Sequence, residues 1–308
     1  MLKCCAFLGK RTKETEETTT KQSIKNSLCC PCSHLNRKVY LSPFTFHFFL
    51  LSLRDYILYK NLTQFIMLSV IYYIVVSMAW LVLYLASWVA LVVCYPFDKK
   101  RRVVHKLSAW LTATVFIFAP GAKRKVVGAE NIDPEKAYVM VLNHQSMVDI
   151  LSIYNLPLVF KWVSKREVYR IPLVGRLLLM HGDIVINRAS AKEAMQLVHT
   201  KGMEWLKKGA SVAIFPEGTR SKDGEIHNFK AGAFILAKDA GVPILPIVLD
   251  GTSSLVRKGW MINWRNVTTI KVLPPIPAEE VVSRDIKDVM TQVRTDMVDA
   301  LAEVRATK

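Results

Sequence analysis

The hydrophobic pattern of the chain is dominated by one long stretch, from Asn61 to Phe97, that contains no charged residue. It also contains no glycine, and no proline before Pro96. About 20 apolar residues in a helix are enough to cross the hydrocarbon core of a bilayer. The stretch therefore predicts a membrane helix, and its length argues against the alternative of a core helix in a soluble protein.

A second apolar run, from Leu107 to Ala119, is too short for an ordinary span and predicts a helix that lies in the membrane interface or dips partway into it. Between the two runs stands a cluster of charges, Asp98-Lys99-Lys100-Arg101-Arg102. Basic residues beside a membrane helix favour the cytosolic side and attract anionic headgroups. We expect a two-helix membrane anchor whose first helix either spans the bilayer or inserts only shallowly.

Short apolar runs and amphipathic stretches alternate after residue 120, which favours an α/β fold with a mixed sheet covered by helices. The helices are stopped by glycines such as Gly209 and Gly241. The pattern predicts strands at 138–142, 159–163, 184–186, 211–215, 244–249 and 267–273, and helices at 191–208, 231–240 and 279–305.

The first part of the chain has a different character. The segment from Thr12 to Ser23 is polar and without periodicity, and the apolar run from Pro43 to Leu53 is too short to span a bilayer. We expect residues 1–60 to be a disordered extension, 61–120 the anchor and 121–308 the catalytic domain. The change in composition motivates the hypothesis that Met67 is the true start, which a peptide from residues 1–60 in the natively expressed protein would exclude.

The chain is strongly basic, with a formal net charge of +17 from 42 Lys+Arg and 25 Asp+Glu over 308 residues. Such a charge attracts nucleic acid, acidic lipids or phosphorylated substrates. Zinc-finger spacing, RNA-recognition signatures, basic heptads and a phosphate-loop motif are all absent from the sequence, so no nucleic-acid partner is expected. The apolar stretch favours membrane lipids.

Five of the six cysteines lie in the first 32 residues, which excludes a disulfide framework for the main domain and favours a cytosol-facing location. Cys29, Cys30, Cys32 and His34 form the one cluster with metal-ligand character. Since no second cluster completes a zinc site, lipid-modified or inert thiols are the preferred interpretation and no metal is expected.

The first candidate site, Asn143-His144-Gln145-Ser146-Met147-Val148-Asp149, follows directly on the predicted strand 138–142. A histidine with a carboxylate nearby suits a general base and the group that orients it. Five residues of regular helix rotate by about 500°, which would leave the two side chains roughly 140° apart. His144 must therefore lie in the loop before the helix. The alternative interpretation is a capping turn without chemistry.

A second candidate, Phe215-Pro216-Glu217-Gly218-Thr219-Arg220-Ser221, also follows a predicted strand. Gly218 permits a tight turn whose backbone N–H groups face an anion, and Arg220 adds a planar guanidinium suited to phosphate. An ordinary charged turn is the alternative. The blocks 182–188, a strand that ends in Arg188, and 242–247, an apolar segment with two prolines, complete the set.

These four blocks, in this order, resemble the glycerolipid acyltransferase family, and within it most closely the 1-acyl-sn-glycerol-3-phosphate acyltransferases. The resemblance covers roughly residues 65–275. It implies that His144 is the general base and that Asp149 orients it. It further implies that phosphate is bound by Glu217, Gly218, Thr219, Arg220, Arg188 and Lys165. Asn187 departs from the family, many members of which carry aspartate before the arginine.

The resemblance implies transfer of an acyl group from acyl-CoA or acyl carrier protein to the sn-2 hydroxyl of lysophosphatidic acid, giving phosphatidic acid without a cofactor. A hydroxyl nucleophile needs a base, and a thiolate leaves readily, so a ternary complex is expected. Ser146 as a covalent nucleophile is disfavoured because the chain has no Gly-x-Ser-x-Gly elbow. Two alternatives stay open: another acceptor, such as glycerol 3-phosphate or another lysolipid, and a non-catalytic protein that binds anionic lipid.

Overall fold

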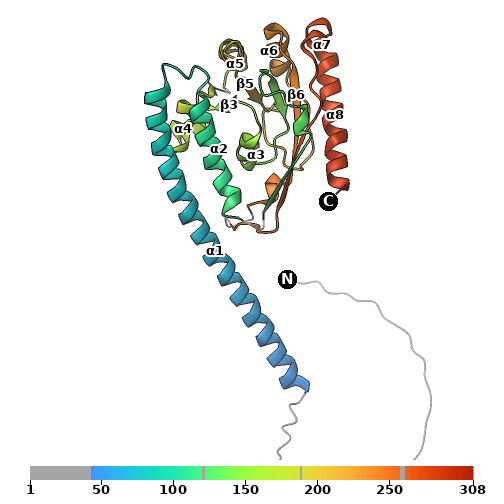
Figure 1. Cartoon of the computed structure of the whole chain (residues 1–308). Coiled ribbons are helices and arrows are strands. Elements are labelled where there is room, and N and C mark those ends of the chain that lie inside the picture. Colours follow the sequence, from blue (N-terminus) through green and yellow to red (C-terminus); the bar gives the residue numbers. More distant parts are fainter. Residues whose placement is uncertain (1–42, 120–121, 188, 257–260, 308) are drawn as a thin grey trace, which may run out of the picture. The chain divides into compact units, whose positions relative to one another are not determined.

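The structure of the chain is a computed structural model that describes residues 43–119, 122–187, 189–256 and 261–307, with side chains from Thr63 onward. Residues 55–308 form one compact unit (Figure 1). The remaining unit, residues 1–54, is described only from Pro43, where it is helical. The N-terminal cysteine cluster and Arg188 lie outside the described residues.

The first helix, α1, runs from Pro43 to Cys94 and is 52 residues long. Residues 43–60, which the sequence assigned to the extension, are therefore helical. A proline is well accommodated in the first turn of a helix, and neither glycine nor proline follows before Pro96, so nothing in this segment interrupts the helix. The part from Thr63 to Cys94 is long and apolar enough to cross a membrane, by length and composition.

The second helix, α2, runs from Arg102 to Ile117 and packs antiparallel against the C-terminal half of α1. Tyr72 donates its hydroxyl to the Val115 carbonyl at 2.9 Å, and the Trp80 indole donates to Leu111 at 3.0 Å. The opposite side of α1 exposes large apolar side chains over its whole length from residue 65, among them Met78, Val82, Val89 and Val92. The expected pair of apolar helices is thus present.

A seven-stranded sheet forms the centre of the unit, in the order β1-β7-β6-β2-β5-β3-β4. Neighbouring strands are parallel except β6 and β7, which confirms the mixed α/β fold. The strands are β1 Lys123–Val127, β2 Val139–Leu142, β3 Phe160–Lys165, β4 Ile184–Ile186, β5 Ser211–Ile214, β6 Ile244–Asp250 and β7 Val267–Val272.

Three features of the secondary structure after residue 120 differ from the predicted pattern, one of which is the unpredicted helix α4, Val174–His181. Strand β1 was not expected, because it is an edge strand with mostly exposed side chains and so lacks a buried alternation. The single helix predicted for 279–305 is divided at Arg284, which is extended, after which Asp285 caps the next helix by accepting from the Lys287 N–H. The remaining helices are α3 Val148–Ser152, α4 Val174–His181, α5 Ala191–Lys207, α6 Gly232–Ala240, α7 Ala278–Ser283 and α8 Ile286–Ala306.

Hydrophobic cores cover both faces of the sheet. Along β2, Val139 and Val141 face the core beneath α5, α6 and α8, while Met140 and Leu142 face a second core that contains Phe160, Trp162 and Tyr154. All four side chains of β2 are fully buried, and each contributes about 1.5–3 kcal/mol by leaving water. The central strand is therefore a rigid base for the loop that follows it.

Candidate active site

The predicted site residues gather at one edge of the sheet. Strands β2, β5, β3 and β4 are consecutive neighbours and parallel, so the segments that follow them emerge at the same edge. His144 follows β2, Glu217 follows β5, Lys165 ends β3 and Asn187 follows β4. The carboxyl edge of a parallel sheet is where ligands bind in open α/β folds.

His144 and Asp149 form a hydrogen-bonded pair. The distance from His144 Nδ1 to Asp149 Oδ2 is 2.7 Å. His144 lies in the loop and Asp149 in the first turn of α3, as the five-residue spacing requires. The same Oδ2 accepts the backbone N–H groups of Gln145 and Ser146, each at 2.7 Å. Three donors thus hold one fully buried carboxylate oxygen in place against the imidazole.

Aromatic stacking fixes the plane of the His144 ring. Its centroid lies 4.0 Å from that of Phe215, with 15° between the planes, and Phe215 in turn stacks on Trp162 at 5.0 Å. The His144 side chain keeps 12% of its surface exposed, whereas Asp149 is completely covered. With Nδ1 engaged by the carboxylate, Nε2 is the ring nitrogen that remains to take up a proton.

Asn143 is a positioning residue that the motif analysis did not single out. Its amide donates to the Leu249 carbonyl at 2.9 Å and accepts the Leu249 N–H at 2.7 Å. These bonds attach the start of the His144 loop to the neighbouring strand β6. A buried asparagine at the end of an apolar strand was the available signal, since such a side chain must find backbone partners.

Glu217 connects the two motifs. One carboxylate oxygen accepts the His144 N–H at 3.0 Å and the other accepts the His227 N–H at 3.1 Å. The Ser221 N–H donates to the His144 carbonyl at 2.8 Å, which adds a second link. Glu217 is buried, and burial raises the pKa of its carboxyl. Glu217 therefore holds the His144 loop in position through these two hydrogen bonds.

The anion-binding features are on the solvent side of this edge. Gly218 has a φ of +74°, and a Cβ there would lie 2.8 Å from Lys230 Nζ. Thr219, Arg220 and Lys165 are exposed. Sequence reasoning missed Lys230, whose backbone N–H donates to the Pro216 carbonyl at 2.9 Å. Among the described residues, no carboxylate forms an ion pair with Lys165, Arg220 or Lys230.

Two largely apolar cavities adjoin these groups. One, of about 200 Å³, is enclosed by α1, α2, α3 and α4 and reaches Met147, three residues from the histidine. Its other lining residues include Trp80, Leu111, Ile150 and Leu177. The second, of about 320 Å³, is lined by Phe215, Gly218 and Lys230 together with Ile186, Met195 and Val198. The site therefore combines a base, free cations and space for hydrocarbon.

Comparison with known proteins agrees with this geometry. The family model described as Acyltransferase matches residues 123–250. The chain is 33% identical to the 1-acyl-sn-glycerol-3-phosphate acyltransferase of Saccharomyces cerevisiae, over 70% of this chain and 72% of the yeast protein. It is 40% identical to a chloroplastic 1-acyl-sn-glycerol-3-phosphate acyltransferase of Brassica napus, over 53% of this chain but only 47% of that protein, so it spans about half of that relative's length.

The crystal structure of the 1-acyl-sn-glycerophosphate acyltransferase PlsC from Thermotoga maritima superposes with a TM-score of 0.56 and 25% identity. The superposition covers 75% of this chain and 98% of the Thermotoga chain. The blocks 143–149 and 215–221 therefore lie in a fold that is shared with a 1-acyl-sn-glycerophosphate acyltransferase. The chain belongs to the acyltransferase family that includes the 1-acyl-sn-glycerol-3-phosphate acyltransferases.

Proposed function

We propose that the protein transfers an acyl group from acyl-CoA or acyl carrier protein to the sn-2 hydroxyl of 1-acyl-sn-glycerol 3-phosphate, giving phosphatidic acid. The observation that carries this proposal is the His144–Asp149 pair. The backbone of His144 is hydrogen-bonded to the Glu217 carboxylate and to the Ser221 N–H, both in the turn that follows the adjacent strand β5. The names of the relatives supply the acceptor, and the geometry supplies the base and the cations.

In the proposed reaction, His144 Nε2 removes the proton of the acceptor hydroxyl as its oxygen attacks the thioester carbonyl. The Nδ1–H bond to Asp149 selects the tautomer with a lone pair on Nε2 and stabilises the imidazolium that forms. Collapse of the tetrahedral intermediate expels the thiolate, which takes up the proton. The proposed step needs no metal or cofactor, because an imidazole base and a thiolate leaving group are sufficient.

The acceptor phosphate is assigned to the exposed cations of the same edge, Arg220, Lys165 and Lys230, with the predicted contact from Arg188 outside the described residues. The backbone around Gly218 adds N–H groups that suit an anion. Glu217 is reassigned from phosphate contact to positioning, since both of its oxygens are engaged by backbone N–H groups and a carboxylate repels phosphate.

The lipid character of the substrates is supported by the apolar cavity beside Met147, which lies between the helices α1 and α2 on one side and α3 and α4 on the other. An acyl chain placed there would keep its carboxyl end near His144. The long apolar surface of α1 supports attachment to a membrane, where lysolipid and product reside. The basic cluster after Phe97 supports a catalytic domain that faces the cytosol.

The test is thiol release from palmitoyl-CoA by detergent-solubilised protein, with and without lysophosphatidic acid, and with product analysis by mass spectrometry. We expect acceptor-dependent release with phosphatidic acid as product, and a loss of about 10²–10⁴-fold in His144→Ala. Ser146→Ala is the matched control in the same loop and should retain activity, because its hydroxyl is not a nucleophile in this scheme.

Release without acceptor would indicate a thioesterase instead, and equal rates with glycerol 3-phosphate would move the proposal to another acceptor. Substitution of acyl carrier protein for CoA identifies the donor. Absence of turnover with every donor and acceptor, in a protein that still binds anionic vesicles after loss of His144, would favour a non-catalytic lipid-binding role.

A further inference from the structure

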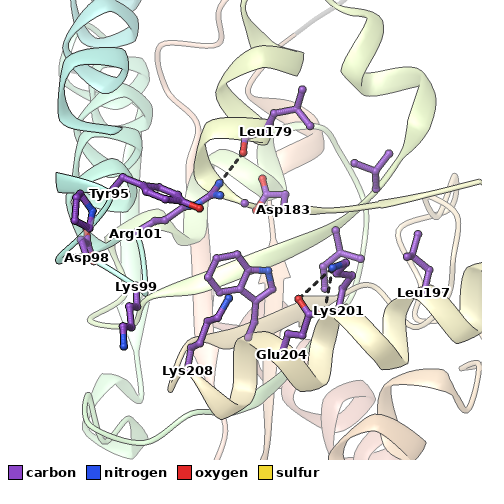
Figure 2. A pocket seen from close by; sticks show the side chains of 15 residues that line it. Tyr95, Asp98, Lys99, Arg101, Leu179, Asp183, Leu197, Lys201, Glu204 and Lys208 are labelled. Atoms are coloured by element: carbon purple, nitrogen blue, oxygen red, sulfur yellow. Dashed lines mark hydrogen bonds and ion pairs between the residues drawn. The ribbon is translucent and has the colours of Figure 1, made fainter. Parts of the chain in front are cut away.

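A basic cavity lies at the edge of the sheet opposite the candidate active site. It has a volume of about 640 Å³ and is formed by the turn between α1 and α2, the end of α4, the start of β4 and one side of α5. Gly182 and Asp183 line it just before β4 begins, which places it at the amino end of that strand, away from His144. Figure 2 shows Arg101 extending toward Leu179, with Lys201 and Glu204 coming from α5 and Lys208 from its C-terminal cap.

Arg101 is built into this cavity rather than left free at the surface. It has a φ of 54°, a left-handed conformation that a residue with a side chain rarely adopts. Its guanidinium Nη1 donates to the carbonyls of Leu179 and Met180, each at 2.8 Å, at the C-terminal end of α4. Among the described residues, no hydrogen bond engages the other guanidinium N–H groups, which can therefore meet a ligand. A strained backbone held in this way is typical of a functional position.

Three basic side chains converge on the aromatic ring of Trp205. The Lys208 ammonium lies 4.6 Å from the centroid of Trp205, the buried Lys161 ammonium 4.8 Å, and the Arg101 guanidinium carbon 5.7 Å. Like charges this close repel one another, and the ring offsets only part of that repulsion. An anion bound between Arg101 and Lys208 would neutralise the excess.

The acidic residues of the cavity are already engaged. Asp98 accepts the Val103 N–H at 2.8 Å, Glu204 pairs with Lys201 at 3.0 Å, and Asp183 contacts His181 at 2.6 Å. Among the described residues, no carboxylate forms an ion pair with Lys99, Arg101 or Lys208. Lys99, Arg101 and Lys208 thus outnumber the carboxylates left in the cavity, Asp98 and Asp183, and the chemistry that these cations fit is a phosphate group.

The surroundings indicate that this phosphate belongs to a lipid. Tyr95, which lines the cavity, is 65% exposed, and Phe97, in the same turn after α1, is 90% exposed. Val89, Val92 and Val93 continue this exposed apolar surface along the helix. Aromatic residues followed by lysine and arginine at the end of an apolar helix are typical of the headgroup level of a membrane.

We propose that the cavity between the α1–α2 turn and α5 binds the phosphate headgroup of an anionic membrane phospholipid, whose acyl chains lie along the exposed end of α1. This is a second lipid site, at the opposite edge of the sheet from His144, and it does not depend on the acyltransferase reaction. Bound lipid would fasten the turn between the apolar helices to α4 and α5.

The experiment titrates dioctanoyl phosphatidylglycerol into the full chain in neutral detergent, without acyl donor. Native mass spectrometry counts bound lipid, and thermal unfolding reports stabilisation. We expect one tightly retained lipid and a raised unfolding midpoint. Lys208→Glu and Lys99→Glu should each weaken binding about tenfold or more, since each loses a charge-assisted contact with the phosphate. Dioctanoyl phosphatidylcholine and inorganic phosphate are the parallel ligands.

The matched controls are Lys207→Glu, which changes the neighbouring exposed lysine of α5, and Lys106→Glu on α2; neither residue lines the cavity. Both should bind phosphatidylglycerol within twofold of the wild type. Equal weakening in all four variants would show diffuse charge attraction and overturn the proposal. So would binding of phosphatidylcholine as tight as that of phosphatidylglycerol, or inorganic phosphate that stabilises equally at the same concentration, which would indicate a soluble anion. Should Lys208→Glu fail to fold, Lys208→Gln replaces it.

Discussion

Among the histidine–aspartate pairs of the described residues, the two shortest are alike in length but differ in surroundings. His144 and Asp149 are 2.7 Å apart at the carboxyl edge of the sheet, and His181 and Asp183 are 2.6 Å apart near the amino edge. The His144 side chain is 12% exposed, whereas His181 is fully buried. A short contact between imidazole and carboxylate is therefore not enough to define a catalytic base.

The second nitrogen of each ring makes the difference. His181 Nε2 lies 2.8 Å from His105 Nδ1, so both of its nitrogens are occupied. Burial lowers the pKa of His181 well below its usual range, with Lys161 and Arg101 adding to the effect, which keeps the ring neutral. His144 Nε2 has no such partner among the described residues. We infer that the first pair is built for proton transfer and the second for holding α2 and α4 together.

Asparagine substitutions at the two aspartates test this contrast with the largest expected effect. Asp149→Asn should lower kcat by about 10²–10⁴-fold, because an amide N–H facing Nδ1 favours the wrong histidine tautomer. The measurement is acyl transfer at saturating substrates, with thermal unfolding as a check that the protein is folded. A fall of less than about tenfold in a folded protein would contradict the role assigned to Asp149.

The same change in the other pair should act on stability. Asp183 is buried beside Lys161, and burial raises the pKa of its carboxyl to about 7, an effect that Lys161 and Arg101 oppose. Asp183→Asn disturbs the buried oxygen that accepts the Trp162 N–H and contacts His181 Nδ1, at a cost of about 1–3 kcal/mol. Denaturant unfolding in detergent measures this cost. Activity per folded molecule should change little, and a selective loss of kcat would contradict the structural role.

The pH dependence of stability sharpens the comparison further. Burial lowers the pKa of Lys161 from 10.5 to about 7. Between these values the unfolded chain binds the proton that the folded chain releases, so stability rises as pH increases from about 7 toward 10, by at most about 1.4 kcal/mol per pH unit. Lys161→Met should abolish this rise, as followed by the unfolding midpoint. The same slope in both proteins would exclude Lys161 as its source.

Much of the fold was predictable because local signals decided it. The buried apolar runs that became β2, β4, β5 and β6 are bounded by glycines or by the motifs themselves, and Gly209 and Gly241 mark the ends of α5 and α6. Strand β1 was not predictable, since Lys123 and Lys125 are exposed on an edge strand and Arg124 between them is only partly buried. Its place depends on pairing with β7, which is remote in the sequence.

In the candidate site, too, local contacts were predictable from the sequence and long-range contacts were not. His144 and Asp149 could be predicted as a pair because both belong to one strand–loop–helix segment, and the family resemblance, rather than the spacing alone, supplied their roles. Glu217 was identified, but its partners were not, since the bond to the His144 backbone joins residues 73 positions apart. Lys230 was missed because it approaches Gly218 only through the path of the chain between β5 and α6. Contacts between residues that are far apart in the sequence are not reflected in its local hydrophobic periodicity.

Lys230 gives the smallest effect and the finest distinction within the catalytic edge. If Lys230 contacts the acceptor phosphate, Lys230→Met should raise KM for lysophosphatidic acid about tenfold and leave kcat within a factor of two, because one charge-assisted bond is lost in ground state and transition state alike.

Glu217→Gln is the contrasting variant. It replaces one acceptor of a backbone N–H by a donor, so it should lower kcat by loosening the His144 loop while KM stays nearly constant. Steady-state kinetics over a range of acceptor concentrations separates the two. A higher KM in Glu217→Gln and an unchanged KM in Lys230→Met would reverse the assignment and return the phosphate contact to Glu217.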